Sequence, residues 1–201
     1  MQKLLASVAL VGLAGAIVVT LTRADNDGAA TAAAPERRPT TTAAVAASAP
    51  PVLAAEANQL VDLDGWLQTD IESLDDLRGN VVIVQFWTFG CINCKRTLPY
   101  LQELYAEHAG AGLEIVGVHS PEFTFEADPA AIAAAAEELG VTWPIALDTR
   151  QRNFFGWQGS RGYWPRTYVI DQQGQVRFDH VGEGKYEELA ATVEFLLEES
   201  A

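Results

Sequence analysis

Two stretches of the chain are apolar and β-branched at nearly every position: VVIVQF over residues 81–86 and LEIVGV over 113–118. A strand that is buried on both faces has this pattern, which is typical of the centre of a parallel or mixed sheet. Between the two stretches, apolar side chains recur at helical spacing from Cys94 to Tyr105. The pattern therefore predicts a β-α-β unit with its crossover helix.

A second helix is predicted over residues 128–140, where the chain carries signals for both helix ends. Asp128 can cap the first turn, Pro129 is tolerated there, and Gly140 suits the stop.

The rest of the chain shows shorter patterns. They predict a strand over 144–147, then two strands over 168–171 and 175–181 that are joined by a hairpin turn at 172–174. An amphipathic helix is predicted from Tyr186 to Leu196. This order predicts an α/β fold in which a central mixed sheet carries helices on both faces.

The N-terminal segment, residues 1–23, is predicted to be a membrane anchor or a signal segment that forms a single apolar helix. Its apolar run over 4–21 lies between Lys3 and Arg23 and is barely long enough to span a bilayer. A long signal peptide, cleaved so that the protein is secreted, is the alternative. In either case we expect the rest of the chain to be extracytoplasmic.

Residues 24–55 are rich in alanine, threonine and proline and have few large apolar side chains. Such a segment cannot bury enough surface to offset the entropy of ordering it, so we predict a flexible tether. The folded domain is then expected over 56–201. The net charge of −14 argues against nucleic acid as a partner, because phosphate binding needs a basic surface.

The chain contains two cysteines, Cys91 and Cys94, directly after the first buried strand and at the start of the predicted helix. A helix N-terminus stabilises a thiolate, which is the reactive form, through its unpaired N–H groups and its dipole. We therefore expect a working dithiol in which Cys91 attacks and Cys94 resolves. A zinc site has less support, because no histidine has ligand-like spacing to the pair. A purely structural disulfide would close a short loop and stabilise little.

FWTFGCINCKRTLPYL, over 86–101, resembles the active-site segment of the thioredoxin-like superfamily. Pro99 matches the helix-kinking proline of that family, although a helix that begins after it would also fit. YWPRTYVID, over 163–171, resembles the segment that carries the family's cis-proline. The resemblance implies that Pro165 is cis, with Trp164 before it, and that it packs beside the dithiol.

Within that superfamily the chain is similar to the TlpA and redoxin branch, and in particular to the extracytoplasmic redoxin domain of DipZ-type proteins. GVHSPEFTFE over 117–126 and GEGKY over 182–186 carry this likeness, which covers about 52–199 and places the branch's insertion over 120–141. It implies a thioredoxin-like fold and a thiol–disulfide oxidoreductase that reduces the disulfides of extracytoplasmic partner proteins. It further implies a separate membrane electron donor, and no metal or organic cofactor beyond the redox-active disulfide of the two cysteines.

Two positions depart from the carboxylates that the family places near the resolving cysteine. Thioredoxins commonly carry a buried carboxylate where this chain has Gln85, and TlpA-like members often carry a glutamate where it has Thr97. Glutamine cannot accept a proton near neutral pH. We expect Glu122 or Glu126 on the insertion to transfer the proton, unless both are solvated loop charges. His119 could lie nearby, but it is expected to be a core histidine.

An apolar groove for an extended partner peptide is expected beside the cis-proline. Its expected lining is Trp87, Phe89, Tyr163 and Trp164. For Trp87, plain packing in the core is the alternative.

Two other functions stay open from the sequence. A thiol peroxidase would fit the wider redoxin likeness of the GVHSPE segment, although a peroxidatic cysteine does not need a CxxC partner. A non-enzymatic chaperone or assembly module would keep its activity without either cysteine.

Overall fold

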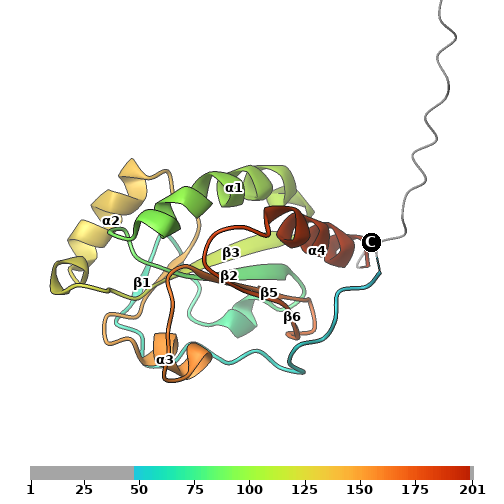
Figure 1. Cartoon of the computed structure of the whole chain (residues 1–201), viewed down its shortest axis with the longest axis horizontal. Coiled ribbons are helices and arrows are strands. Elements are labelled where there is room, and N and C mark those ends of the chain that lie inside the picture. Colours follow the sequence, from blue (N-terminus) through green and yellow to red (C-terminus); the bar gives the residue numbers. More distant parts are fainter. Residues whose placement is uncertain (1–47, 200–201) are drawn as a thin grey trace, which may run out of the picture. The chain divides into compact units, whose positions relative to one another are not determined.

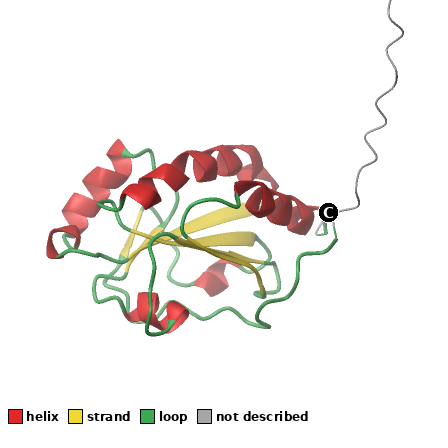
Figure 2. Cartoon of the chain, viewed as in Figure 1, coloured by secondary structure: helices red, strands yellow, loops and turns green. Residues whose placement is uncertain are grey.

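Six strands form one mixed β-sheet in the computed structural model, which describes residues 48–199 (Figure 1, Figure 2). Across the sheet they follow the order β1-β4-β3-β2-β5-β6. The neighbours β2–β3 and β3–β4 are parallel, whereas β1–β4, β2–β5 and β5–β6 are antiparallel. The strands are β1 Trp66–Leu67, β2 Val81–Trp87, β3 Leu113–His119, β4 Ile145–Leu147, β5 Arg166–Ile170 and β6 Val176–Val181.

The two predicted central strands are β2 and β3, which lie side by side in the middle of the sheet. They pair in parallel, from Val81 opposite Leu113 to Trp87 opposite His119. Every residue of β2 is buried, because packed layers cover both faces of the sheet. That burial explains the nearly continuous apolar sequence, and the predicted β-α-β unit is confirmed.

Helices cover both faces of the sheet (Figure 1). α1, α2 and α4 pack on one face, and α3 with the short 3-10 helix η1 packs on the other. The helices are η1 Leu74–Leu77, α1 Ile92–His108, η2 Ala109–Ala111, η3 Thr124–Glu126, α2 Pro129–Glu138, α3 Arg152–Gln158 and α4 Tyr186–Glu198. The predicted α/β fold is confirmed, with a second face built from two helices that the sequence did not reveal.

α3 lacks the sequence signals that usually mark a helix start. Its N-cap residue, Gln151, has a φ of +56° and makes no side-chain capping bond. The N–H groups of Asn153 and Phe154 donate instead to the buried carboxylate of Asp148, at 3.0 and 2.8 Å. Ser120 donates its hydroxyl to the same carboxylate at 2.9 Å, so the cap depends on contacts between loops.

The ends of α1 and α2 agree better with the sequence. Pro99 lies inside α1, so the alternative of a helix that begins after it is wrong. Asp128 caps α2 as predicted, because its carboxylate accepts the N–H of Ala130 at 3.0 Å.

The predicted hairpin joins β5 and β6. Gly174 in its turn has a φ of +86°, which glycine adopts without steric cost, and donates its N–H to the Asp171 carbonyl at 2.9 Å. β5 begins at Arg166, two residues earlier than predicted, because Arg166 still pairs with Phe86 of β2.

Residues 48–55, the end of the predicted tether, lie along β6. Leu53 donates its N–H to the Val176 carbonyl at 2.8 Å, and Val176 donates to Ala54 at 3.0 Å. The Arg177 guanidinium donates to the Pro50 carbonyl at 2.7 Å. This end of the segment is therefore attached to the domain, because the edge strand β6 has backbone groups free to pair with it.

The predicted membrane anchor over 4–21 and most of the predicted tether lie outside the described residues. Among residues 48–199, no helix is both long enough and apolar enough to cross a membrane.

Candidate active site

Cys91 is the N-cap residue of α1, at the end of the turn that follows β2. Its side chain is half-buried, and its Sγ accepts the backbone N–H of Cys94 at 3.3 Å. A hydrogen bond from the Cys94 thiol, helped by the N–H groups of Cys94 and Asn93, lowers the pKa of Cys91 to about 7. Burial and the charge of Glu122 act in the opposite sense. This thiol is therefore more readily ionised, and so more reactive, at neutral pH than an ordinary cysteine.

Cys94 lies in the first turn of α1 and is completely buried. Burial, followed by the hydrogen bond and the charge of Cys91, raises the pKa of Cys94 far above that of an ordinary thiol. Both cysteines are free thiols. One sulfur is thus accessible and partly ionised and the other is buried and protonated, as the predicted division between attacking and resolving thiol requires.

The loop before β5 approaches Cys91 closely. The Trp164–Pro165 peptide bond is cis, as the resemblance implied, and the Cys91 thiol lies 3.9 Å from the Trp164 carbonyl oxygen. The half-buried Trp164 indole donates to the Ser120 carbonyl at 2.8 Å and stacks on Phe154 with ring centroids 4.1 Å apart. These two contacts hold the loop beside the thiol.

Trp87 packs in the core, which confirms the alternative to its expected place in the groove. It is 1% exposed, and its ring meets His119 edge-on with centroids 5.2 Å apart. As the last residue of β2 it lies on the same face as Val81 and Ile83, and packed layers cover both faces of this central strand. Phe89 is half-buried and does lie beside the site.

Gln85 and Thr97 form a neutral pair in the core beneath the cysteines. The Gln85 amide donates to the Thr97 hydroxyl at 2.9 Å, and that hydroxyl donates to the Cys94 carbonyl at 2.7 Å. Neither side chain can take a proton from a thiol near neutral pH. A proton acceptor for Cys94 must therefore come from another part of the fold.

Glu126 is the buried one of the two acids expected on the insertion. It is 0% exposed, and its carboxylate accepts the N–H groups of Gly90 at 2.9 Å, Glu122 at 2.7 Å and Phe123 at 2.9 Å. A Cβ on Gly90 would stand 2.1 Å from Glu126 Oε1, so the glycine makes room for the carboxylate. The charge of Glu126 adds to the raised pKa of Cys94. Glu122 is exposed, so the interpretation as a solvated charge fits Glu122 and fails for Glu126.

His119 is a core histidine that touches the same turn. Burial lowers its pKa to about 4, so the ring is neutral at physiological pH. Its Nε2 accepts the N–H of Phe89 at 3.4 Å, and the two rings stack with centroids 5.5 Å apart. The imidazole and the Glu126 carboxylate together fix the backbone of two consecutive residues just before Cys91.

Gly90 and Phe125 are site residues that the sequence did not single out. The Phe125 ring lies edge-on to Phe89 at 6.0 Å between centroids and comes within 3.6 Å of the position of a Cβ on Gly90. The available signal was the alternation of acids and aromatic residues in EFTFE, over 122–126.

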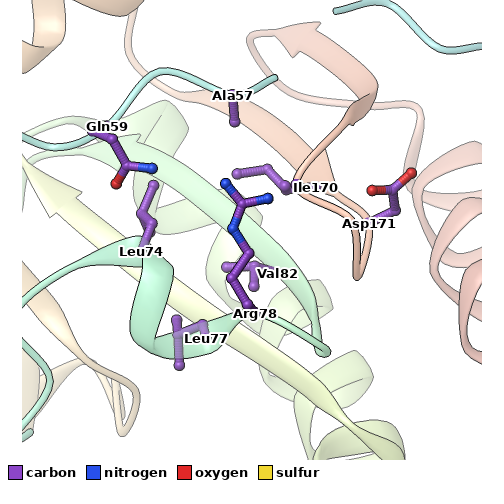
Figure 3. Close-up of a pocket in the computed structure, with 9 residues that line it drawn as sticks. Ala57, Gln59, Leu74, Leu77, Arg78, Val82, Ile170 and Asp171 are labelled. Atoms are coloured by element: carbon purple, nitrogen blue, oxygen red, sulfur yellow. The ribbon is translucent and has the colours of Figure 1, made fainter. Parts of the chain in front are cut away.

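A small apolar pocket lies at the other end of β2 from the cysteines (Figure 3). Val82, Ile170 and Leu74 line it, the Arg78 side chain lies among them, and Asp171 stands to one side. Its room of about 20 Å³ suits one water molecule and no substrate. Within the described part of the chain, no group of three or more histidine, cysteine or acidic side chains is placed to hold a metal ion.

Comparison with known proteins identifies relatives over most of the described domain. A family model described as the AhpC/TSA family matches residues 54–179. Protein DipZ of Mycobacterium tuberculosis is 40% identical over 148 residues, which are 72% of this chain and 21% of DipZ. The thiol-disulfide oxidoreductase ResA of Bacillus anthracis is 31% identical over 125 residues, which are 60% of this chain and 68% of ResA. The chain thus spans about a fifth of DipZ, the more similar of the two.

Solved structures share the fold. A thiol-disulfide isomerase from Corynebacterium glutamicum superposes with a TM-score of 0.60 at 22% identity, covering 74% of this chain and 96% of that one. A thioredoxin-like protein in its oxidised form superposes with a TM-score of 0.60 at 27% identity, covering 69% and 91%. The predicted thioredoxin-like fold is thereby confirmed.

Proposed function

Because the chain belongs to the AhpC/TSA family, in its thioredoxin-like redoxin branch, we propose that it is a protein thiol–disulfide oxidoreductase that works through Cys91 and Cys94. One observation carries the proposal: an accessible thiol with a pKa of about 7 caps α1, three residues before a completely buried thiol. The Trp164 carbonyl oxygen lies 3.9 Å from the accessible thiol, where the backbone of a partner peptide can meet the loop, and supports the same interpretation.

The reaction proceeds in two exchanges. The Cys91 thiolate attacks one sulfur of a partner disulfide, a Cys91–partner disulfide forms, and the second partner sulfur leaves as a thiolate. Cys94 then loses its proton and attacks Cys91 Sγ, which releases the first partner sulfur. The partner gains two electrons and the chain is left with a Cys91–Cys94 disulfide. No other redox group is needed for this half of the cycle.

The buried thiol needs a proton acceptor in the second exchange, and we assign this role to Glu126. The hydrogen bond and charge by which Cys91 raises the pKa of Cys94 disappear once Cys91 is in a disulfide, but the penalty of burial remains. Glu126 is a buried carboxylate whose charge reaches Cys94, whereas exposed Glu122 acts on Cys91. A carboxylate that reaches the thiol directly or through one water molecule can act as a general base, and this is the placement that we propose for Glu126.

Reaction of the reduced full chain with a small disulfide tests the proposed chemistry. We expect the rate of the first exchange to rise with pH through a midpoint of about 7, because the thiolate of Cys91 forms there. Stopped-flow measurement of thiol release between pH 5 and 10 would show this. A midpoint at the ordinary thiol value of about 8.5 would contradict an activated Cys91.

A thiol peroxidase is the second candidate, because the matched family carries the AhpC/TSA description. Consumption of hydrogen peroxide by the reduced chain, faster than its reaction with protein disulfides, would favour that function. A chaperone that needs neither cysteine would keep its binding activity when both are replaced by serine.

The acidity of Cys91 supports the proposed direction of electron flow, in which the chain reduces its partner. Thioredoxin, a reductant at about −270 mV, has an attacking thiol of pKa about 7, whereas an oxidant at about −120 mV has one of about 3.5. Because the pKa of Cys91 is about 7, we expect a reductant with a potential nearer the first value. Equilibration in graded thiol buffers measures it. A potential close to the second value would reverse the proposed roles of chain and partner.

The proposed setting is extracytoplasmic, with the chain anchored through residues 4–21 or secreted after their removal. The apolar run and its flanking charges support this placement. The partners are then disulfide-bearing proteins outside the cytoplasm, and a separate electron donor in the membrane returns the dithiol to its reduced form.

A further inference from the structure

Large apolar side chains are exposed next to Cys91 and on the segments that contact its neighbours. The most exposed of them are Ile92 at 58%, Phe123 at 54%, Phe125 at 64% and Tyr163 at 47%. Ile92 follows Cys91 in the chain, and Tyr163 precedes the Trp164 carbonyl that lies 3.9 Å from the thiol. Exposed apolar surface of this kind marks interaction sites.

Phe123 and Phe125, which we call the aromatic lip, are held in place before any partner arrives. Their rings stack with centroids 5.7 Å apart and planes 6° from parallel. Phe125 also meets the Phe89 ring edge-on at 6.0 Å, and the Phe123 N–H donates to Glu126 at 2.9 Å. A preformed surface loses little conformational entropy when it binds.

The aromatic lip lies where the residues next to a partner's reactive cysteine would contact it. Phe125 comes within 3.6 Å of the Cβ position of Gly90, the residue before Cys91. A partner that forms a disulfide with Cys91 brings the neighbours of its own cysteine to this place. A bulky apolar neighbour would be buried against the two rings, which is favourable, whereas a small polar neighbour would gain little.

Charge around the thiol works against acidic partners. The exposed carboxylate of Glu122 is close enough to raise the pKa of Cys91, and the chain as a whole carries a net charge of −14. An acidic residue beside a partner cysteine would be repelled, and so would a small anionic thiol such as glutathione.

We propose that the aromatic lip selects protein disulfides in which a bulky apolar residue, and no acidic one, stands next to the reactive cysteine. The proposal rests on the proposed oxidoreductase function and names its substrate class. The occupant is an extended segment of the partner polypeptide. In the first exchange its cysteine sulfur bonds to Cys91 Sγ, and the other sulfur of its disulfide leaves as a thiolate.

Short peptides with one cysteine linked to 2-thiopyridine provide the test. Attack by Cys91 on the peptide sulfur releases 2-thiopyridone, which absorbance reports, and the full chain with Cys94→Ala limits the reaction to this step. Leucine, serine or aspartate is placed beside the cysteine. We expect the leucine peptide to react about tenfold faster than the serine peptide, as burial of a large apolar side chain allows. The aspartate peptide is expected to be the slowest.

The ratio of the leucine to the serine rate is the readout, because a general loss of thiol reactivity cancels in it. We expect Phe125→Ser to reduce the ratio to below about twofold, since most of the apolar contact is lost. The matched control is Phe155→Ser, which removes another exposed phenylalanine, on α3. This variant should keep the tenfold preference. Glu122→Gln should narrow the gap between the aspartate and serine peptides.

Equal rates for the leucine and serine peptides, or a preference that survives Phe125→Ser, would overturn the proposal. A chain that fails to react even with hydroxyethyl disulfide would instead overturn the oxidoreductase function itself. The lip could also serve a second copy of this chain or a membrane. Dissociation of a dimer by Phe125→Ser in sedimentation, or loss of binding to lipid vesicles in that variant, without any peptide preference, would replace our assignment.

Discussion

Replacing Cys91 with serine is expected to lower the rate of disulfide exchange by at least about a thousandfold. A serine hydroxyl is not ionised near neutral pH and cannot form a disulfide, so the first exchange has no nucleophile. Cys94 cannot take over, because it is completely buried and its pKa is strongly raised. Reduction of insulin by the full chain, followed by turbidity, measures the loss.

The matched variant Cys94→Ala separates the two roles. It keeps the attacking thiol and loses the resolving one, so partner proteins should accumulate as mixed disulfides with Cys91. Non-reducing electrophoresis would show adducts that disappear on addition of a thiol. If Cys91→Ser formed such adducts and Cys94→Ala did not, the two roles would have to be exchanged.

Replacing Glu126 with glutamine is expected to slow the second exchange about a hundredfold, within the usual contribution of a general base. The rate of the first exchange depends on the Cys91 thiolate and should change far less. The mixed disulfide should therefore persist, and its decay can be followed after a single turnover. The pH dependence of this decay separates a general base from a purely structural role. The variant should recover its rate at alkaline pH, where Cys94 loses its proton without help, whereas a structural defect would slow the decay at every pH.

Two further variants control this experiment. Glu122→Gln changes the exposed acid on the same insertion and should leave the decay of the mixed disulfide within about threefold of the original rate, as expected for a surface charge. Gly90→Ala places a Cβ 2.1 Å from Glu126 Oε1 and should displace the carboxylate without removing it. A normal rate in Glu126→Gln, with thermal stability retained, would show that Glu126 only holds the turn.

The centre of the sheet could be predicted from the sequence because burial on both faces leaves an unambiguous apolar pattern in β2 and β3. The second face could not be predicted in the same way. α3 depends on the Asp148 carboxylate, which is close only after the chain has folded. β1 has two residues, too few for any periodic signal, and its pairing with β4 defines it.

The reactive pair was evident from the sequence because both cysteines occur in one turn at a strand–helix junction. The difference between Glu122 and Glu126 could not be predicted from the sequence, because nothing in the sequence shows which of two acids four residues apart is buried. Trp87 shows the opposite error. Its place next to the motif suggested the groove, but both faces of β2 are covered by packed layers, so the side chain lies in the core.

The backbone hydrogen bonds of Leu53 and Ala54 to Val176 show at which end of the sheet the chain enters the domain. β6 runs in the same direction as β2, because both are antiparallel to β5. The chain therefore joins the domain at the starting end of these strands, and Cys91 emerges at the finishing end, about 20 Å away along seven residues of strand. The point at which any upstream segment enters the domain and the reactive sulfur therefore lie at opposite ends of the sheet.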